Sequence, residues 1–151
     1  MIEVGHIIGD FELKDQNDQI FKTSDHRDKK LLLSFHPLAW TPVCRDQMLS
    51  LEKNYDRFLE LNTIPVGISV DSVFCKKAWA EALGIKKLRM LCDFWPHGGF
   101  AMRLGLLRLK EGFSERANLI VSEDGKLAFI KVYPITEVPD IEEIVERLRL
   151  I

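Results

Sequence analysis

Residues 31–44 read Leu-Leu-Leu-Ser-Phe-His-Pro-Leu-Ala-Trp-Thr-Pro-Val-Cys, and this stretch decides the fold. Its first five residues form a short apolar run, which is typical of a buried strand. From Met48 onward apolar residues recur at helical spacing, so a helix must begin between the two patterns. Thr41 is the natural N-cap, and Pro42 then falls at the first helical position, where its fixed φ helps and its missing N–H costs nothing. The pattern therefore places Cys44 at the third helical position.

Cys44 thus lies where negative charge is favoured. The free N–H groups of a first helical turn and the helix dipole both stabilise an anion. Because the thiolate is the nucleophilic form of cysteine, this position predicts a reactive thiol. The local pattern fits a second interpretation equally well, in which Cys44 is a small buried apolar residue, as most free cysteines are.

Composition bounds the remaining possibilities. The chain has 151 residues, 46% hydrophobic, with a net charge of -2, which predicts a single domain over residues 1–151 and gives no footprint for a nucleic-acid partner. No segment is apolar enough to span a bilayer and the N-terminus has no basic stretch before an apolar run, so we expect no membrane association and a cytoplasmic location. Three scattered cysteines are too few for a secreted disulfide framework, and thiol chemistry in a reducing compartment fits better.

The order of expected elements predicts an α/β fold. Period-two patterns and turn signals predict strands at 10–14, 19–23, 31–35, 64–70, 88–91, 117–121 and 127–133. Helical patterns predict one helix from Thr41 to about Leu61, one from Asp71 or Ser72 to Gly84 with a buried stripe of Cys75, Ala78, Trp79 and Ala82, a short one at 97–105 and a closing one through 141–148. This order is that of a thioredoxin-like fold, a central mixed sheet flanked by helices, with an N-terminal β-hairpin at its periphery.

The spacing Pro-x-x-x-Thr-x-x-Cys, formed by Pro37, Thr41 and Cys44 after an apolar strand, resembles the active-site motif of the peroxiredoxins. This is the thiol-specific antioxidant and alkyl hydroperoxide reductase family. Segments 9–13, 71–79 and 114–117 are also similar to family segments, so the resemblance covers nearly the whole chain and is greatest to the bacterioferritin-comigratory-like or one-cysteine subgroups. The chain departs from the family pattern in three residues, Gly9 for a frequent proline, Trp40 for a more usual Phe and Arg45 for a more usual Thr or Pro.

The resemblance implies a thiol-dependent peroxidase that reduces hydrogen peroxide and organic hydroperoxides. The Cys44 thiolate would attack the peroxide and become a sulfenic acid. By the same resemblance, the Thr41 hydroxyl and the Cys44 N–H hold the peroxide, Arg116 stabilises the charge on the sulfur and the leaving oxygen, and Pro37 shields the sulfur from water. Gln47 matches a position that the family fills with Glu or Gln, and is expected to orient Arg116. Spacing alone does not bring Arg116 to Cys44.

The step that reduces the sulfenic acid stays open. One subgroup keeps a resolving cysteine at the position of Leu49, which this chain lacks. Cys75, in the first turn of the second core helix, is either the resolving cysteine or a core residue, and Cys92 is expected to pack. If neither resolves, thioredoxin or another thiol reduces Cys44 directly. The family's habit implies a possible homodimer.

No cofactor is expected. Cys92, His97 and His36 lack the spacing of zinc ligands, so no metal is expected either. The competing function is a thioredoxin-like redox-sensing or binding module in which Cys44 is oxidised slowly, without efficient peroxide turnover. The presence of all four motif residues, including Arg116, favours the peroxidase.

Overall fold

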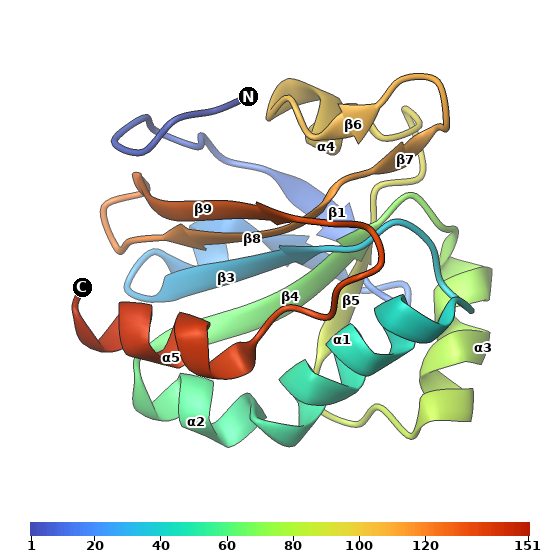
Figure 1. Ribbon diagram of the computed structural model, residues 1–151, viewed down its shortest axis with the longest axis horizontal. Helices are drawn as coiled ribbons and strands as arrows, with labels where there is room; N and C mark the ends of the chain where they lie inside the picture. Colours follow the sequence, from blue (N-terminus) through green and yellow to red (C-terminus); the bar gives the residue numbers. More distant parts are fainter.

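One seven-stranded mixed sheet organises the chain in the computed structural model, which describes residues 1–151 (Figure 1). The sheet order is β2-β1-β5-β4-β3-β8-β9. Its strands are β1 (Glu12–Lys14), β2 (Ile20–Lys22), β3 (Lys30–Phe35), β4 (Thr63–Ser69), β5 (Arg89–Cys92), β8 (Arg116–Val121) and β9 (Leu127–Tyr133). The predicted α/β fold with a central mixed sheet is confirmed, and the N-terminal hairpin forms the sheet edge beyond β5.

Strand β3 lies in the interior of the sheet, between β4 and β8, where its apolar run is covered on both faces. All six of its residues are buried. It pairs in parallel with β4 and antiparallel with β8, so that Phe35 lies opposite Ile68 on one side and Ala117 on the other. The chain leaves the sheet at Phe35, and the residues that follow therefore start at the carboxyl end of β3, beside the first residues of β8.

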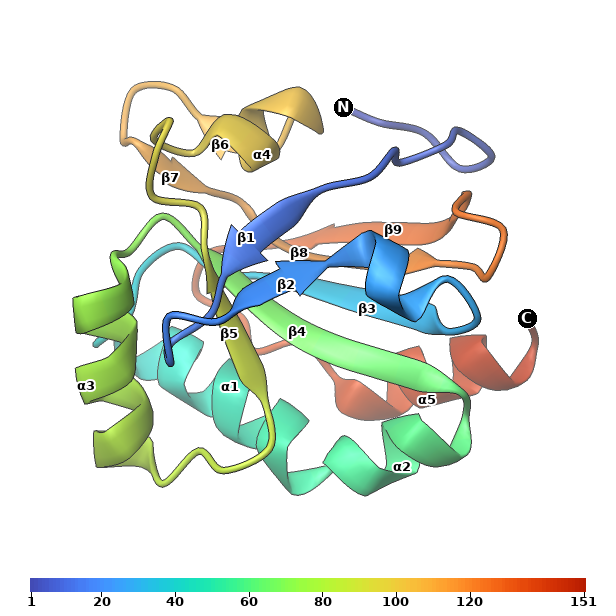
Figure 2. The same ribbon diagram turned by 180° about the vertical axis from the view of Figure 1, so that it is seen from behind.

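The helices cover both faces of the sheet unequally. They are α1 (Pro42–Lys53), α2 (Tyr55–Glu60), α3 (Val73–Leu83), α4 (Gly99–Arg103) and α5 (Ile141–Arg149), with a short 3-10 helix at Thr23–His26. Helices α1, α2, α3 and α5 cover one face, whereas α4, the N-terminal segment and the small hairpin of β6 (Leu107–Arg108) and β7 (Phe113–Ser114) cover the other (Figures 1 and 2). No helix combines the length and apolar character needed to span a bilayer.

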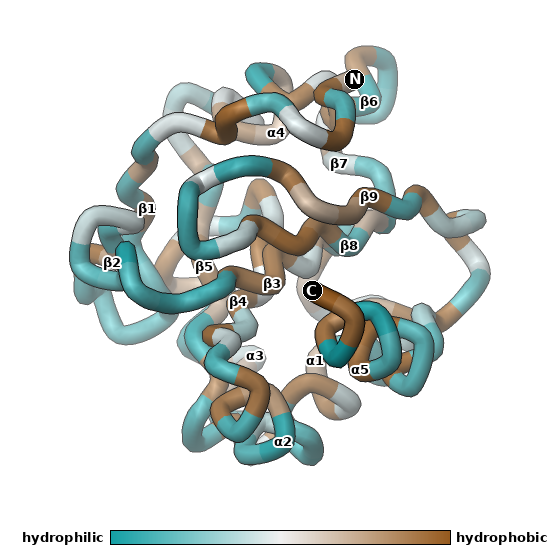
Figure 3. Tube along the Cα trace, turned by 90° about the vertical axis from the view of Figure 1, so that its left-hand side faces the viewer, coloured by the Kyte–Doolittle hydropathy of each residue, from teal (hydrophilic) through white to brown (hydrophobic).

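Two apolar clusters fill the space between the sheet and these two layers. Leu33 and Phe35 belong to the cluster on the α4 face, and Leu32 belongs to the cluster on the α1 face together with Cys44 and Met48. This alternation follows from the period of two along a strand. In Figure 3 the hydrophobic segments of β3 and β8 run through the interior. Cys44 is therefore part of the packed core between the sheet and α1.

Two predictions about helices were wrong in detail. The single helix expected from Thr41 to about Leu61 is broken at Asn54, whose side-chain amide donates to the Ser50 carbonyl and ends α1. In α3 the buried residues are Lys76, Trp79 and Ala80, whereas Ala78 and Ala82 of the predicted stripe are exposed. The helix is therefore rotated from the hydropathy-based expectation, with a lysine turned inward.

Candidate active site

Cys44 occupies the third position of α1 and is fully buried. Thr41 has extended backbone angles and is the N-cap by position, and Pro42 stands at the first helical position. The Thr41 hydroxyl does not cap the helix, because it donates instead to the Leu38 carbonyl at 2.8 Å. No side chain takes up the first-turn N–H groups, so the Cys44 N–H remains available to an anion or a polar ligand.

Arg116, the first residue of β8, reaches Cys44 across the sheet. Its Nη1 donates to Cys44 Sγ at 3.3 Å and to Gln47 Oε1 at 2.8 Å. Its Nε and Nη2 donate to the Ile135 carbonyl at 3.1 and 2.7 Å. Three acceptors hold a guanidinium that is only 2% exposed. The structure thus brings together a buried thiol and a fixed cation that the sequence pattern alone could not join.

Gln47 continues a buried polar chain behind this cation. Its Nε2 donates to Ser34 Oγ at 2.8 Å and to the Phe35 carbonyl at 3.1 Å. Ser34 Oγ in turn donates to Asn118 Oδ1 at 2.7 Å. Sequence reasoning missed Ser34 and Asn118. The signal for them was a single polar residue inside each of two apolar strands.

The segment between β3 and α1 is held by Asp71, which lies just before α3. Pro37 is buried, and Trp40 adopts φ 70° with its side chain 57% exposed. Asp71, just before α3, accepts from the Ala39 N–H and from Ser69 Oγ through one carboxylate oxygen, at 2.8 and 2.7 Å. This carboxylate ties the motif segment to the end of β4.

Cys75 also stands at the third position of a helix, but its surroundings differ. Its backbone N–H donates to Ser72 Oγ at 3.2 Å, and its thiol donates to Asp71 Oδ1 at 3.7 Å. Burial raises the pKa of the Cys75 thiol, and the negative charge of Asp71 raises it further. Partial burial and the Asp71 carboxylate therefore act against the Cys75 thiolate, although this thiol stands in the first turn of a helix.

Cys92 is part of the sheet. It lies opposite Ser69 of β4 and Lys14 of β1. Burial raises its pKa to about 11. All three cysteines are free thiols, and no group of three or more His, Cys, Asp or Glu side chains gathers in a metal-binding arrangement.

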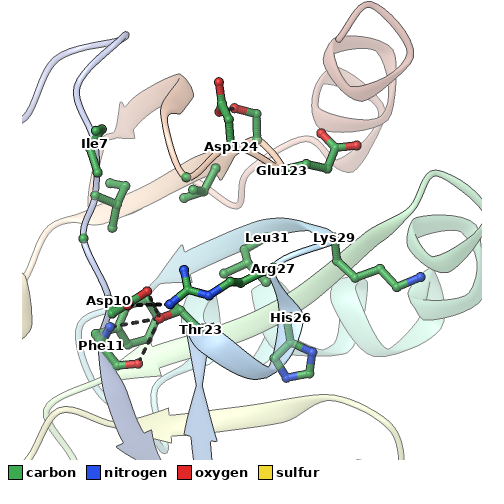
Figure 4. A pocket seen from close by; sticks show the side chains of 15 residues that line it. Ile7, Asp10, Phe11, Thr23, His26, Arg27, Lys29, Leu31, Glu123 and Asp124 are labelled. Atoms are coloured by element: carbon green, nitrogen blue, oxygen red, sulfur yellow. Dashed lines mark hydrogen bonds and ion pairs between the residues drawn. The ribbon is translucent and has the colours of Figure 1, made fainter.

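A pocket of about 260 Å³ lies at the opposite end of β3 and β8, where Leu31 and Val121 are in its lining (Figure 4). The Arg27 guanidinium extends into it and pairs with Asp10 at 2.8 Å. None of the predicted site residues lines this pocket. The chemistry of the buried thiol, rather than this pocket, therefore locates the candidate site.

Comparisons with known proteins identify the family of the chain. The sequence matches the AhpC/TSA family over residues 4–130. It is 32% identical over 141 residues to alkyl hydroperoxide reductase E of Mycobacterium tuberculosis, covering 93% of this chain and 92% of that protein. It is 32% identical over 152 residues to a peroxiredoxin of Thermotoga petrophila, covering 97% and 70%. The crystal structure of Enterococcus faecalis AhpC superposes with a TM-score of 0.90 at 29% identity, over 99% of this chain and 92% of that one.

Proposed function

The chain belongs to the AhpC/TSA family, the peroxiredoxins, and is a thiol-dependent peroxidase; from this premise we propose that Cys44 is its peroxidatic cysteine. The observation that carries the proposal is the 3.3 Å contact from Arg116 Nη1 to Cys44 Sγ. Gln47 and the Ile135 carbonyl hold the same guanidinium, so the cation is in position before the substrate arrives.

The reaction assigned to this site transfers one oxygen atom. The Cys44 thiolate sulfur attacks one oxygen of a hydroperoxide, and the S–O bond forms as the O–O bond breaks. The electron pair leaves on the other oxygen, which takes up a proton and departs as water or alcohol. Sulfur is oxidised to the sulfenic acid while the peroxide is reduced. Arg116 stabilises the charge that moves from sulfur to the leaving oxygen.

Thr41 and the first turn of α1 are assigned to peroxide binding. The Thr41 hydroxyl donates its hydrogen bond to the Leu38 carbonyl, which leaves its lone pairs as acceptors for a peroxide O–H. The uncapped N–H of Cys44 supplies a donor for the other oxygen. Buried Pro37 limits the access of water to the sulfur.

The test is to add one equivalent of hydrogen peroxide, trap the sulfenic acid with dimedone and identify the labelled peptide by mass spectrometry. We expect the adduct on Cys44. A variant with Cys75→Ser and Cys92→Ser serves as the control, because it leaves Cys44 as the sole thiol. A Cys44 left unlabelled in both proteins, while peroxide is consumed, would refute the assignment.

For the second half of the cycle we propose that Cys75, rather than Cys92, condenses with the sulfenic acid. Cys75 is half-buried in the first turn of a helix, and helix ends fray at modest cost. Cys92 is held between two strands. A disulfide requires the two Cα atoms to approach within about 7 Å, so the first turns of α1 and α3 must open.

Peptide mapping after one equivalent of peroxide separates the possible cycles. A Cys44–Cys75 disulfide supports the proposal. A Cys44 sulfenic acid that persists with both other thiols free contradicts it and makes the protein a one-cysteine enzyme. Turnover with thioredoxin and its reductase, measured against turnover with a small thiol at equal reducing capacity, then identifies the reductant, and we expect thioredoxin to be the better one.

We further propose that the protein forms a homodimer through the groove between β1 and the start of α3. This groove of about 840 Å³ is lined by Phe74, Phe94 and Trp95. Phe74 and Trp95 are 86% and 82% exposed, and such an aromatic patch is typical of an interaction surface. The charged residues Asp18 and Lys14 in the same groove pair with each other at 3.1 Å, so the groove presents no unpaired charge from this pair to a second copy, as suits a patch that meets itself across a two-fold axis.

Sedimentation equilibrium tests this interface. The native chain is expected at twice the monomer mass, and Phe74→Glu with Trp95→Glu is expected to give monomers that keep their circular dichroism spectrum. A native chain that is monomeric at all concentrations, or a variant that stays dimeric, contradicts the proposal.

A further inference from the structure

Helix α3 carries a lysine with no exposed surface. Lysine is almost never fully buried unless it is paired, yet Lys76 is 0% exposed and forms no ion pair with a carboxylate. Its Nζ lies 2.6 Å from Nε2 of His36, which is also 0% exposed. The Trp79 ring lies beneath the same ammonium, 5.5 Å away. The roles assigned above to the active-site residues leave this pair unused.

The hydrogen bonds indicate that the Lys76–His36 pair carries a single positive charge. His36 Nε2 accepts from Lys76, so Nδ1 carries the ring hydrogen and points to the Ser34 carbonyl at 3.5 Å. Burial, the charge of Lys76 and, to a smaller extent, that of Arg116 hold the pKa of His36 well below its ordinary value. The imidazole is therefore neutral, and the positive charge belongs to Lys76.

The pair joins α3 to the segment that carries the active-site motif. His36 directly precedes Pro37, its N–H donates to the Ile68 carbonyl at 3.0 Å, and its own carbonyl accepts from Ser114 Oγ at 3.3 Å. Because its backbone is fixed on both sides, the ring gives Lys76 a rigid acceptor. The ammonium is consequently held at His36, directly before the motif segment, rather than free to reach solvent.

The charged and titratable groups that face Lys76 come from several elements. Besides His36, they are Asp71 before α3, Cys92 of β5, Cys44 of α1 and Cys75 of α3, and each of these four raises the pKa of Lys76. Burial lowers it by more, so that the pKa of Lys76 is about 8. The ammonium is therefore charged at neutral pH, and its charge favours the anionic form of each of the three cysteines.

We propose that Lys76, held by His36, is a positioning residue of the peroxidase reaction, a second buried cation that acts with Arg116 to favour negative charge on Cys44. The inference rests on the proposed role of Cys44. Lys76 touches neither sulfur nor peroxide and gives up no proton in the step. Its charge lies beside His36 while the Arg116 charge lies beside the sulfur, so that removal of either one leaves the other in place.

A pH dependence follows from this arrangement. The Lys76 charge is present below its pKa of about 8 and is lost as the pH rises through that value. The Cys44 thiolate therefore loses stabilisation as the pH rises through 8, so the rate of peroxide reduction per enzyme should rise with pH more gradually than a single thiol ionisation gives. A lysine with a purely structural role gives no such broadening of the pH profile.

Lys76→Met is the decisive variant, because methionine is apolar and of similar length. A shift of one pKa unit is a tenfold change in the thiolate equilibrium, and we expect Cys44 oxidation at pH 7 to slow by about three- to tenfold. The broadening of the pH profile near pH 8 should disappear. The midpoint of urea unfolding should stay unchanged or rise, since replacing a buried charge by a well-packed apolar side chain is often neutral or stabilising.

Lys77→Met, the same change at the next, exposed position, is the matched control and should retain the native rate and pH profile. A folded Lys76→Met with native rate and profile overturns the inference. If that variant does not fold, His36→Phe provides the test, since Lys76 without an acceptor is held neutral and the same loss is expected, and a native profile there overturns it too. Dimedone labelling of Cys44 in the Cys75→Ser, Cys92→Ser variant separates this outcome from failure of the proposed function.

Discussion

Two cysteines of this chain occupy the same position in two helices, and their surroundings make them different thiols. Cys44 is the third residue of α1 and Cys75 the third residue of α3, each after a hydroxyl residue at the N-cap. At α1 the Thr41 hydroxyl turns away to the Leu38 carbonyl, and a guanidinium lies 3.3 Å from the sulfur. The first turn there offers both free N–H groups and a cation.

At the start of α3, two neighbouring side chains cancel the effect of the helix N-terminus on the thiol. Ser72 Oγ takes up the Cys75 N–H, and the carboxylate of Asp71 faces the thiol at 3.7 Å. The pKa of Cys75 is accordingly raised. A helix N-terminus therefore does not by itself make a reactive thiol. The charged group that faces the sulfur, a cation at Cys44 and a carboxylate at Cys75, decides whether the thiolate is favoured. Substitution can change either group.

The largest effect is expected from removing the Cys44 sulfur. Cys44→Ser should lower peroxide turnover to the uncatalysed rate, because a serine hydroxyl forms no reactive anion at neutral pH. Cys75→Ser should leave the first oxidation of Cys44 at its native rate. Rapid-mixing measurements of peroxide consumption test both expectations, and circular dichroism checks that each variant is folded. Turnover that persists in Cys44→Ser would contradict the assignment.

Removing the cation beside Cys44 should have the next largest effect. Arg116→Met deletes the donor that faces the sulfur, and loss of one such preorganised donor costs about 100-fold or more in rate. Alkylation of Cys44 by iodoacetamide at pH 6 should slow as well, since the thiolate loses its partner. The matched control is Arg149→Met, the same substitution at an exposed arginine that pairs with Glu146. Equal rates in the two variants would exclude a role for Arg116.

The hydroxyl at the first helix start should matter for rate and little for stability. Thr41→Val keeps the shape of the side chain and removes the acceptor assigned to the peroxide. A hydrogen bond to a charged or reacting group is worth about 1.5–3 kcal/mol, so Cys44 oxidation should slow about tenfold or more. Urea unfolding should change little, because the hydroxyl does not cap α1. A stability loss without a rate loss would show that Thr41 is merely structural.

The start of α1 could be predicted from the sequence because its signals are local. An apolar run, a threonine, a proline and a helical repeat follow one another within residues 31–51, and they fix Cys44 at the third position without any tertiary information. The break at Asn54 was missed because one polar residue in a helical repeat is compatible with a continuous helix. Its side-chain bond to the Ser50 carbonyl is visible only in the structure.

The partners of Cys44 were beyond local patterns. Arg116 stands 72 residues away and arrives through the pairing of β3 with β8, so family resemblance alone suggested it. Lys76 was missed for another reason. Hydropathy assigns a lysine to the solvent side of a helix, but its bond to His36 and the packing on Trp79 turned it inward. Hydropathy thus gave the wrong orientation for Lys76, because a tertiary hydrogen bond holds this charged side chain inside the protein.

The second helix start can be made more like the first by removing its carboxylate. Asp71→Asn keeps an acceptor for the Ala39 N–H but deletes the negative charge that raises the pKa of Cys75. The pKa of Cys75 should fall, and its alkylation at pH 8 should become about three- to tenfold faster by the measure of one pKa unit per tenfold. Peptide-resolved mass spectrometry follows Cys75 separately from Cys44. An unchanged rate for Cys75 would mean that burial alone suppresses its ionisation.

The smallest effect is expected where the two helix starts differ in stability alone. Ser72→Ala removes the only side-chain cap of α3, which should lower the free energy of unfolding by about 1 kcal/mol. Ser50→Ala within α1 is the control, since no side-chain hydrogen bond of Ser50 is lost there. The rate of Cys44 oxidation should be native in both variants, because neither touches the sulfur or its cation. If Ser72→Ala slowed Cys44 oxidation instead, the cap of α3 would be coupled to the motif segment, in which case the two helix starts would work as one unit.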